Sequence, residues 1–387
     1  MKWEKVKLGK YVEILSGFAF KSKDFLNCGV PVIKIKNITQ EGVTLEDVSY
    51  ISKELADKNE KYHLNYNDIL IALTGSHINQ VSSVVGRIAR IKYHENSLLN
   101  QRVGKVFAKD SKLCDIDYVY YFLSQDYIKI SLASKAGGAA NQANISPNDV
   151  KSLTVRWPDI ETQHRIADIL SAYDDLIENN QKQIKLLEEA AQRLYKEWFV
   201  DLRFPGHENT KIVDGVPEGW RRGLLKELIS VNYGKDHKKA PDDGNIPVYG
   251  SGGLMRKCNK SLFSGEAVLI PRKGSLNNIM YVDETFWTVD TMFYATMKQL
   301  HTAVFVYYFV KAFDMYSMNI GAAVPSMTTK ILDAMDVVIP DKETLEKFDK
   351  RAKVYFNKIK TLQGQNERLK TARDLLLPKL MSGEVEV

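Results

Sequence analysis

The feature of this sequence that most restricts its fold is a long amphipathic segment near its middle. Between Gln163 and Phe199 the larger apolar side chains recur in alternating steps of four and three residues. These positions are Ile166, Leu170, Tyr173, Ile177, Ile184, Leu187, Ala191, Leu194 and Trp198, with one polar interruption at Asn180. A 3.5-residue repeat sustained over this length predicts a long helix packed along another helix. At about 1.5 Å per residue this helix would be roughly 50 Å long, which is more than a compact domain needs for its own core.

Mixed strand and helix patterns lie on both sides of this segment. Runs such as Pro31–Ile38, Asp68–Leu73 and Val84–Ile91 have strand character, and residues 115–134 have helical spacing. The sequence therefore predicts an α+β protein. Its predicted parts are a first globular domain (1–158), a central long helix (159–200), a linker rich in Pro, Gly and polar residues (201–219), a second globular domain (220–340) and a C-terminal long helix with the tail (341–387).

The two halves of the chain resemble one another, which indicates an internal repeat. VPVIKI from Val30 matches IPVYGS from Ile246, LIALTGS from Leu70 matches VLIPRKGS from Val268, and YVYYFL from Tyr118 matches FVYYFV from Phe305. Placing Pro158 on Pro340 sets an offset of 182 residues for the helices. At this offset the seam of the first helix falls on Phe348, Ala352, Tyr355, Ile359, Leu362, Asn366 and Leu369.

Two equivalent long helices can bury their seams against each other. We expect an antiparallel two-helix coiled coil that separates two similar globular domains and relates them by a pseudo-twofold axis. Polar seam residues commonly fix register, so Asn180 is predicted to face Asn366, and Ile177 to lie near Leu369. Paired residue numbers would then sum to about 546. The alternative is that each helix packs on its own globular domain and the two asparagines are solvated.

Composition restricts the class of protein only loosely. A net charge of +6 permits a polyanionic partner without requiring one. The three cysteines are scattered, which favours a reducing compartment over a disulfide framework. Apolar runs such as Thr302–Val310 are too short for a membrane span, and no signal peptide is visible after Met1. We therefore expect a cytoplasmic protein without a membrane partner.

Catalytic motifs are missing from the sequence. There is no HExxH, no G-x-S-x-G, and no clustered His, Cys or acidic metal site. Gly250–Gly253 lacks the spacing and the lysine of a phosphate-binding loop, so a tight turn explains its glycines better. A self-contained DNA methyltransferase or endonuclease would need an Asn/Asp-Pro-Pro-aromatic motif or a clustered acidic metal site, and the sequence has neither. The chain is interpreted as non-catalytic, with no metal or cofactor of its own.

Candidate DNA contacts are found in the globular domains. Lys34 and Lys36 would share one face of a strand, and LTGS (Leu73–Ser76) and PRKGS (Pro271–Ser275) would be equivalent loops at strand ends. Hydroxyls, amides and cations at loop tips suit phosphate and base-edge contacts, although ordinary polar loops have the same composition. The predicted DNA-binding residues are Lys34, Lys36, Asn37, Thr74, Ser76, Tyr249, Ser251, Arg272, Lys273 and Ser275.

Several motifs together resemble the specificity subunit of type I restriction-modification systems. The family's Q-x-x-I-A-x-x-L pattern is matched by Gln163, Ile166, Ala167 and Leu170. The resemblance continues through the segments LYKEWF (Leu194–Phe199) and DLRFPG (Asp201–Gly206). VPEGW (Val216–Trp220) is similar to the family's entry into its second variable domain, and LLLPKLMSGE (Leu375–Glu384) to its C-terminal signature. The tail departs from the pattern, because Leu345 and Phe348 replace the glutamine and isoleucine.

The resemblance implies a division of labour among subunits. Each globular domain would be a target-recognition domain for one half of a bipartite double-stranded DNA site, and the helices would be the spacer. Two modification subunits, with S-adenosylmethionine, and restriction subunits, with ATP and Mg²⁺, would be the partners. A purely structural coiled-coil adaptor is the remaining alternative, but it leaves two globular domains with diverged loop tips unexplained.

Overall fold

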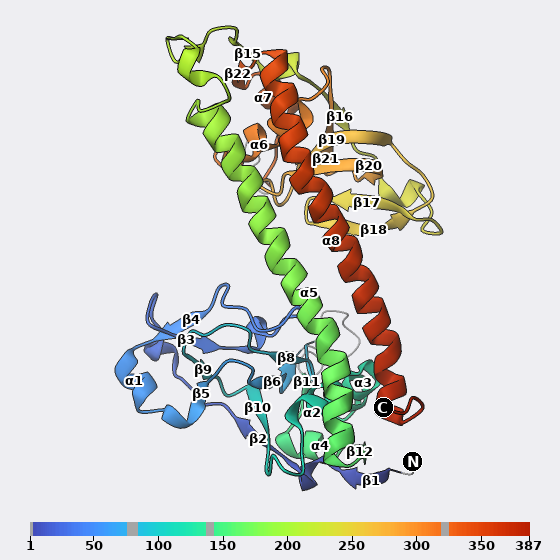
Figure 1. The fold of residues 1–387 in the computed structure, drawn as a ribbon. Coiled ribbons are helices and arrows are strands. Elements are labelled where there is room, and N and C mark those ends of the chain that lie inside the picture. The colour runs from blue at the N-terminus through green and yellow to red at the C-terminus, as the bar shows by residue number, and fades with distance from the viewer. Residues whose placement is uncertain (1–2, 76–83, 137–142, 319–324) are drawn as a thin grey trace. The chain divides into compact units, whose positions relative to one another are not determined.

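The computed structural model describes residues 3–75, 84–136, 143–318 and 325–387. The chain forms two compact units: unit 1 contains residues 1–179 and 366–387, and unit 2 contains residues 180–365. Two long helices, α5 (Ile160–Tyr195) and α8 (Lys342–Ser382), were predicted from the seam pattern, and both are present (Figure 1). Both unit boundaries fall inside these helices, so each helix contributes one part to each unit.

Unit 1 is built on a four-stranded antiparallel sheet with the order β2-β10-β6-β8. Its strands are β2 (Val12–Ser16), β10 (Val103–Ala108), β6 (Ile69–Ala72) and β8 (Ile88–Arg90). Side chains alternate along β6, so Ile69 and Ile71 join one core while Leu70 and Ala72 join another on the opposite face. The sheet is therefore covered on both faces, which explains the uninterrupted apolar run in the sequence.

A second sheet and several short elements complete unit 1. The second sheet has the order β4-β3-β9-β5, with β3 and β9 parallel. Its strands are β4 (Ser49–Ile51), β3 (Val30–Ile33), β9 (Ser97–Leu99) and β5 (His63–Leu64). Two short antiparallel pairs are β1 (Glu4–Lys7) with β12 (Thr154–Trp157), and β7 (Thr74–Gly75) with β11 (Ala143–Asn144).

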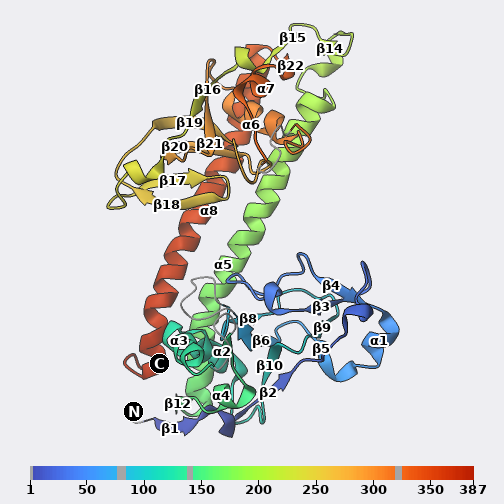
Figure 2. The ribbon, with the colours of Figure 1, turned by 180° about the vertical axis from the view of Figure 1, so that it is seen from behind.

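The helices of unit 1 are α1 (Lys53–Asp57), α2 (Ile116–Ser124), α3 (Asp126–Ser134) and α4 (Pro147–Lys151). Figure 2 shows α2, α3 and α4 close to the N-terminal part of α5, and all four contribute side chains to one core. The single helix predicted over 115–134 is wrong, because Gln125 has an extended backbone (ψ 133°) that separates α2 from α3.

The glutamine that opens the amphipathic segment ties α5 to α2. Gln163 is fully buried; its side-chain oxygen accepts the backbone N–H of Asp115 at 3.0 Å, and its amide donates to the Pro158 carbonyl at 3.0 Å. Asp115 in turn accepts the backbone N–H groups of Asp117 and Tyr118 and so caps α2. The glutamine thus satisfies buried backbone groups where two helices begin.

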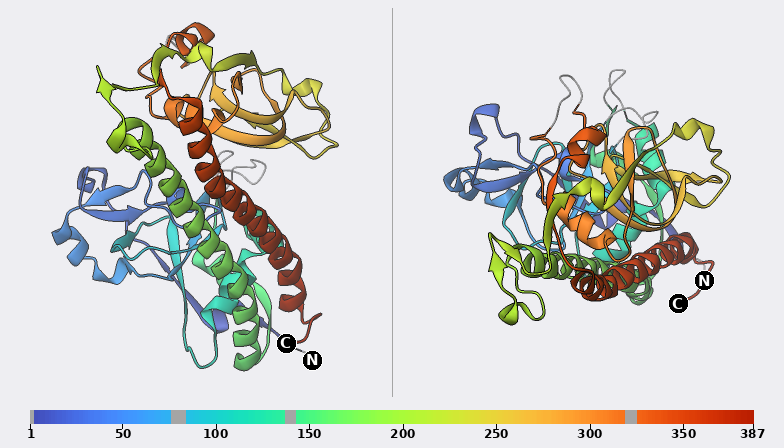
Figure 3. Two further views of the ribbon diagram at one scale, coloured as in Figure 1. Left: turned by 45° about the horizontal axis from the view of Figure 1, so that its top comes forward. Right: turned by 90° about the horizontal axis from the view of Figure 1, so that it is seen from above.

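Unit 2 has one larger sheet with the order β16-β21-β19-β20-β17-β18. Its strands are β16 (Ile229–Tyr233), β21 (Met292–Met297), β19 (Phe263–Pro271), β20 (Met280–Thr288), β17 (Ile246–Gly250) and β18 (Gly253–Cys258). The yellow and orange strands of Figure 3 show this sheet curving. As in β6, the side chains of β19 alternate between two cores, with Val268 and Ile270 on one face and Ala267 and Leu269 on the other.

The remaining elements of unit 2 surround an aromatic-rich core. They are β13 (Ile212–Val213), β14 (Val216–Pro217), β15 (Arg221–Leu224), β22 (Asp336–Ile339), α6 (Ala303–Lys311) and α7 (Thr329–Asp333). A π-helical turn, Lys196–Val200, extends the end of α5. It places the ring centroid of Phe199 4.8 Å from the ring centroids of both Phe305 and Phe348. The segment predicted as a linker contains the β13–β14 hairpin. The ring centroid of its Phe204 lies 4.8 Å from that of Trp220, with the two rings tilted by 36°.

The predicted internal repeat is present as a repeated topology. In unit 1, β1 pairs with β12 and the sheet runs β2-β10-β6-β8; in unit 2, β15 pairs with β22 and the sheet runs β16-β21-β19-β20. Each unit also has a parallel pair at the corresponding place, β3 with β9 and β17 with β20. Because strand order and direction agree, residues of the two units can be matched through their hydrogen bonds rather than through sequence letters alone.

Candidate nucleic-acid interface

The loop after β19 contains three predicted contact residues, Arg272, Lys273 and Ser275, and is held by backbone hydrogen bonds. The Arg272 N–H donates to the Thr291 carbonyl at 2.8 Å, the Arg272 carbonyl accepts the Met327 N–H at 2.9 Å, and the Gly274 N–H donates to the Pro325 carbonyl at 3.3 Å. Gly274 has φ +86°, a left-handed conformation that favours glycine. These bonds hold the loop to two other segments of unit 2.

The side chains of this loop are arranged for contact with an anion. Arg272 is half-buried, with its guanidinium carbon 5.8 Å from the centroid of the exposed Tyr233 ring. Lys273 and Ser275 are exposed. A guanidinium braced on an aromatic ring beside an exposed ammonium and a hydroxyl suits phosphate or base-edge contacts.

The β17–β18 turn lies against the same loop. The Asn278 amide donates to the Ser251 carbonyl at 2.9 Å, and a Cβ at Gly274 would lie only 2.8 Å from the Ser251 hydroxyl oxygen. Ser251 therefore belongs with Arg272, Lys273 and Ser275 in one cluster. Tyr249 does not, because its hydroxyl donates to the Glu284 carboxylate at 2.5 Å and burial raises its pKa. Tyr249 stays a prediction as a DNA contact; its side chain is half-buried and hydrogen-bonded within unit 2.

The prediction for Lys34, Lys36 and Asn37 is also wrong in its geometry. The strand β3 ends at Ile33, and Ile35–Asn37 form a 3₁₀ turn, so Lys34 and Lys36 share no strand face. Lys34 lies 3.5 Å above the Phe25 ring and donates to Ser49, and burial lowers its pKa. Asn37 is fully buried, donating to the Glu46 carbonyl and accepting the Lys34 N–H. Of these three residues only Lys36 is exposed.

The LTGS segment differs from the expected loop tip as well. Thr74 and Gly75 form the buried strand β7, and the Thr74 hydroxyl donates to the Asn144 side-chain oxygen at 2.8 Å. Thr74 is therefore a buried residue of unit 1, whose hydroxyl bonds to the side chain of Asn144, the residue that it pairs with on β11. Ser76 lies outside the described residues.

The two units share a backbone frame at these strand ends. The Leu73 N–H donates to the Arg102 carbonyl at 3.0 Å, as Arg272 does to Thr291, and the Leu73 carbonyl accepts the Ile145 N–H at 2.9 Å, as Arg272 does from Met327. The frame also includes the residues directly after β2 and β16. There the Gly17 N–H donates to Val103, and the Gly234 N–H donates to Met292, both at 3.0 Å.

The shared frame identifies residues that sequence reasoning missed. Because Val103 pairs with Ala72 and Met292 pairs with Pro271, Gln101 and Arg102 in unit 1 match Asp290 and Thr291 in unit 2. Gln101, Arg102 and Asp290 are exposed, as is Lys235 at the end of β16. The sequence contains a pattern that could have identified them. Gln101–Arg102 and Asp290–Thr291 are each two polar residues directly before an apolar strand, at matching places in the repeat.

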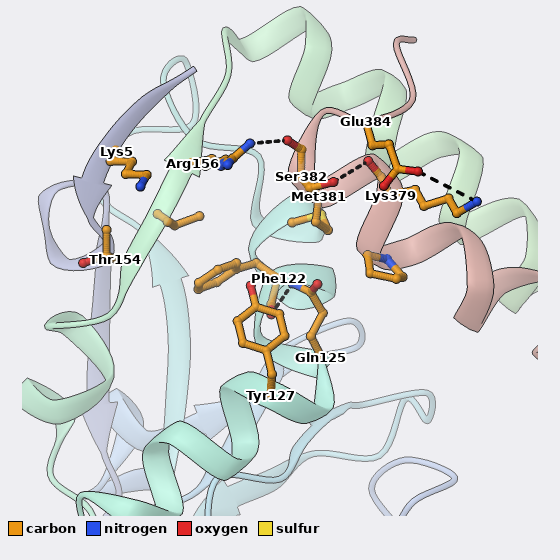
Figure 4. Close-up of a pocket in the computed structure, with 12 residues that line it drawn as sticks. Lys5, Phe122, Gln125, Tyr127, Thr154, Arg156, Lys379, Met381, Ser382 and Glu384 are labelled. Carbon is orange, nitrogen blue, oxygen red and sulfur yellow. Dashed lines mark hydrogen bonds and ion pairs between the residues drawn. The ribbon is translucent and has the colours of Figure 1, made fainter. Parts of the chain in front are cut away.

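An open cavity of about 680 Å³ in unit 1 is lined by other elements (Figure 4). The cations Lys5, Arg156 and Lys379 surround it, and Arg156 donates to the Ser382 carbonyl at 2.6 Å. Glu384 is the one carboxylate of its lining, which contains no histidine or cysteine. Its carboxylate is paired, because Glu384 lies 4.0 Å from the Lys379 ammonium.

Within the described ranges, no group of three or more His, Cys, Asp or Glu side chains is placed to hold a metal ion. None of the helices in that part of the chain combines the length and apolar character that crossing a bilayer needs.

Comparison with known proteins places the fold and the repeat in a wider group. The family model described as the type I restriction modification DNA specificity domain matches residues 1–189 and 217–371, once in each half. The type I restriction enzyme MjaIX specificity subunit of Methanocaldococcus jannaschii is 26% identical over 318 residues, which cover 74% of this chain and 73% of the relative. The putative MjaX specificity subunit of the same organism is 23% identical over 408 residues, covering 100% and 94%.

A solved structure is similar over the whole chain. The crystal structure of the type I restriction-modification system S subunit from M. genitalium matches with a TM-score of 0.62. The match covers 98% of this chain and 96% of that chain, at 18% identity. At this identity the likeness shows the two-domain fold of mixed helix and sheet, and not the bases that are read.

Proposed function

The chain belongs to the type I restriction-modification DNA specificity family, as a specificity subunit for DNA sequence recognition, and we propose that it reads a bipartite site. One unit contacts each half-site through the strand-end cluster. In unit 2 this cluster consists of Tyr233, Lys235, Ser251, Arg272, Lys273 and Ser275. In unit 1 the exposed turn before β10, with Gln101 and Arg102, lies at the matching place, whereas the matching residues Leu73 and Thr74 are buried.

The observation that carries this proposal is the repeated frame. Two loops with the same backbone hydrogen bonds, at 3.0 Å from Leu73 to Arg102 and 2.8 Å from Arg272 to Thr291, present different side chains. A duplicated reader with conserved geometry and altered surface chemistry is what two unlike half-sites require. A structural adaptor would have no use for either the frame or the difference.

We also propose that α5 and α8 form the spacer between the two readers, as an antiparallel coiled coil with a pseudo-twofold axis. With 36 residues, α5 is about 54 Å long, which exceeds one turn of B-DNA, about 34 Å. Every seam residue named from the sequence is buried or half-buried, which supports pairing. The domain boundaries predicted from the sequence follow from this arrangement: residues 1–158 and 220–340 are the readers.

Two contacts inside unit 1 support the antiparallel direction. The Asn366 amide donates to the Ile177 carbonyl at 3.4 Å, and Arg373 pairs with Asp174. The residue numbers sum to 543 (177 and 366) and 547 (174 and 373), which bracket the predicted 546. Asp174 also accepts the Tyr121 hydroxyl at 2.7 Å, so the pair is tied to α2. The pairing of Asn180 with Asn366 remains part of the proposal.

The chain itself is proposed to be non-catalytic and to act in the cytoplasm. S-adenosylmethionine, ATP and Mg²⁺ would be bound by two modification subunits and by restriction subunits that assemble on this chain. The exposed faces of α5 and α8 are the proposed docking surface. The cavity of Figure 4 adds a cationic recess at the end of α8.

Incubating the purified chain with DNA and S-adenosylmethionine, alone and with the modification subunit, tests this division of labour. We expect methyl transfer only in the presence of the modification subunit, at sites sharing one bipartite motif. Methyl transfer by the chain alone would show that it carries its own active site. Methylation at an uninterrupted motif by the assembled complex would show that the units do not read separate half-sites.

A further inference from the structure

The turns that precede β10 and β21 hold a rigid and equivalent position in the two units. The Val103 N–H donates to the Asn100 carbonyl at 2.9 Å, and the Met292 N–H donates to the Val289 carbonyl at 3.0 Å. Each turn also packs against a glycine. A Cβ at Gly17 would lie 2.2 Å from the Asn100 oxygen, and one at Gly234 would lie 1.9 Å from the Val289 oxygen. Because each glycine lies so close to the backbone of the turn, it fixes the position of the two residues that follow Asn100 or Val289.

The side chains on these turns have no structural task that explains them. Gln101, Arg102 and Asp290 are exposed, and none of the three has a side-chain hydrogen bond or ion pair within the described part of the chain. Other aspartates at turns in unit 2 do have such bonds: Asp236, for example, accepts the Lys238 N–H at 3.0 Å. Asp290 therefore lacks the backbone-capping role that usually explains an aspartate in a turn.

The negative charge of Asp290 distinguishes a base-reading surface from one that binds only phosphate. Its turn is hydrogen-bonded to the Arg272 and Lys273 N–H groups through the Thr291 carbonyl. If this cluster bound only phosphate, a carboxylate among its cations would repel the ligand and weaken binding. A carboxylate is useful on such a surface when it accepts a hydrogen bond from a base amino group, which only cytosine N4 and adenine N6 offer in the major groove.

Gln101 and Arg102 carry the complementary chemistry in unit 1. An arginine fork matches the O6 and N7 acceptors of guanine, and a glutamine amide matches the N6 and N7 atoms of adenine. We infer that these equivalent turns are the base-reading elements of the two units, with Gln101 and Arg102 contacting purine edges in one half-site and Asp290 accepting from an amino group of cytosine or adenine in the other. This inference rests on the proposed bipartite reading.

The test is methylation mapping with the assembled modification complex, using the variants Arg102→Ala and Asp290→Ala. Each variant should relax one position, or two adjacent positions, in its own half-site, with discrimination there falling about 10- to 100-fold, as for loss of one good base contact. The other half-site and the spacing should be unchanged. Arg102 and Asp290 variants should affect opposite half-sites.

Matched controls come from exposed charges at the opposite ends of two strands, β10 and β17, that reach the clusters. Lys112→Ala lies beyond the other end of β10, and Asp243→Asn precedes β17, whereas Ser251 follows it. Both controls should leave the motif unchanged. An Asp290→Ala complex that keeps full discrimination, or an Arg102→Ala complex that relaxes both half-sites equally, would overturn the inference. A wild-type complex without a bipartite motif would instead refute the proposed function.

Discussion

The strand-end clusters of the two units have the same backbone and different chemistry. Where unit 2 places Tyr233, Lys235, Arg272 and Lys273, the matching positions of unit 1 hold Ser16, Phe18, Leu73 and Thr74. Three cations in one unit correspond to none in the other, yet the hydrogen bonds between strands agree position by position. The comparison shows that the frame is set by strand pairing and close glycine contacts, and that side chains on it can change freely.

The largest effect is expected where the frame itself is broken. Gly234→Ala would place a methyl group 1.9 Å from the Val289 carbonyl oxygen, so the turn carrying Asp290 must move. Overpacking of this kind typically costs about 1–3 kcal/mol and displaces the backbone. We expect recognition of one half-site to be lost, measured as cleavage or methylation of matched and mismatched sites by the assembled complex. The equivalent Gly17→Ala should remove recognition of the other half-site.

The control for this prediction lies in the neighbouring turn. A Cβ added at Gly252 would meet no heavy atom within 4 Å, and the residue is exposed, so Gly252→Ala should leave thermal stability and recognition unchanged. If Gly234→Ala behaves like Gly252→Ala, the close glycine contact does not hold the frame.

The second prediction concerns the cations that only unit 2 carries. Replacing Arg272 and Lys273 with alanine should weaken DNA binding by the assembled complex about tenfold at physiological salt, and reduce the slope of log affinity against log salt by about 2. The measurement is a binding titration at several salt concentrations. Lys112→Ala in unit 1, an exposed cation beyond the end of β10, serves as the charge control. An unchanged salt slope would remove Arg272 and Lys273 from the interface.

A smaller difference separates the caps of the two long helices. Asp159 accepts the Thr162 N–H at 2.8 Å at the start of α5, and Asp341 accepts the Thr344 N–H at 2.9 Å at the start of α8. Asp341 also accepts the Trp220 indole N–H at 3.0 Å. Asp341→Ala should therefore cost about 1–2 kcal/mol of stability, and Asp159→Ala less, because only one of these caps also anchors the second globular domain.

The pH dependence of these caps has a definite sign. Hydrogen bonds from Thr162 lower the pKa of Asp159. Burial raises the pKa of Asp341, but the hydrogen bonds from Thr344 and Trp220 outweigh burial and lower this pKa overall. A lowered folded-state pKa means that the stabilisation is present above the unfolded value, 3.8, and is lost as the pH falls through the folded value. Thermal melts of wild type and Asp341→Ala should differ from pH 5 to 8, and the difference should shrink only as the pH falls below 3.8 and through the lowered folded-state pKa. A constant difference at acid pH would contradict the cap assignment.

Much of the fold follows from periodicity in the sequence. The seam from Ile166 to Leu187 predicted a long helix because burial along one face imposes a 3.5-residue repeat. The match of LIALTGS to VLIPRKGS identified equivalent strands because β6 and β19 are each buried on both faces. These patterns are local, because each buried position requires an apolar residue and the spacing of such residues follows the helix or strand period.

The candidate site was harder to predict because its geometry depends on distant residues. Alternation suggested that Lys34 and Lys36 continue a strand, but the Asn37 side chain turns the chain through its bond to Glu46. Thr74 was expected at a loop tip, and only its pairing with Asn144 shows that it is buried. Gln101 and Asp290 became equivalent only through strand registers, which no single stretch of sequence contains.

The central claim is that two equivalent frames read separate half-sites, and grafting the side chains of one frame onto the other tests it most directly. The variant Asp290→Gln with Thr291→Arg places the Gln101–Arg102 pair of unit 1 on the matching turn of unit 2. Mapping methylated sites made by the assembled complex should show one half-site altered at the contacted position, towards the base read at that position in the other half-site. The second half-site and the spacing should stay as in the wild type. A motif that changes in both halves, or in neither, would contradict the account.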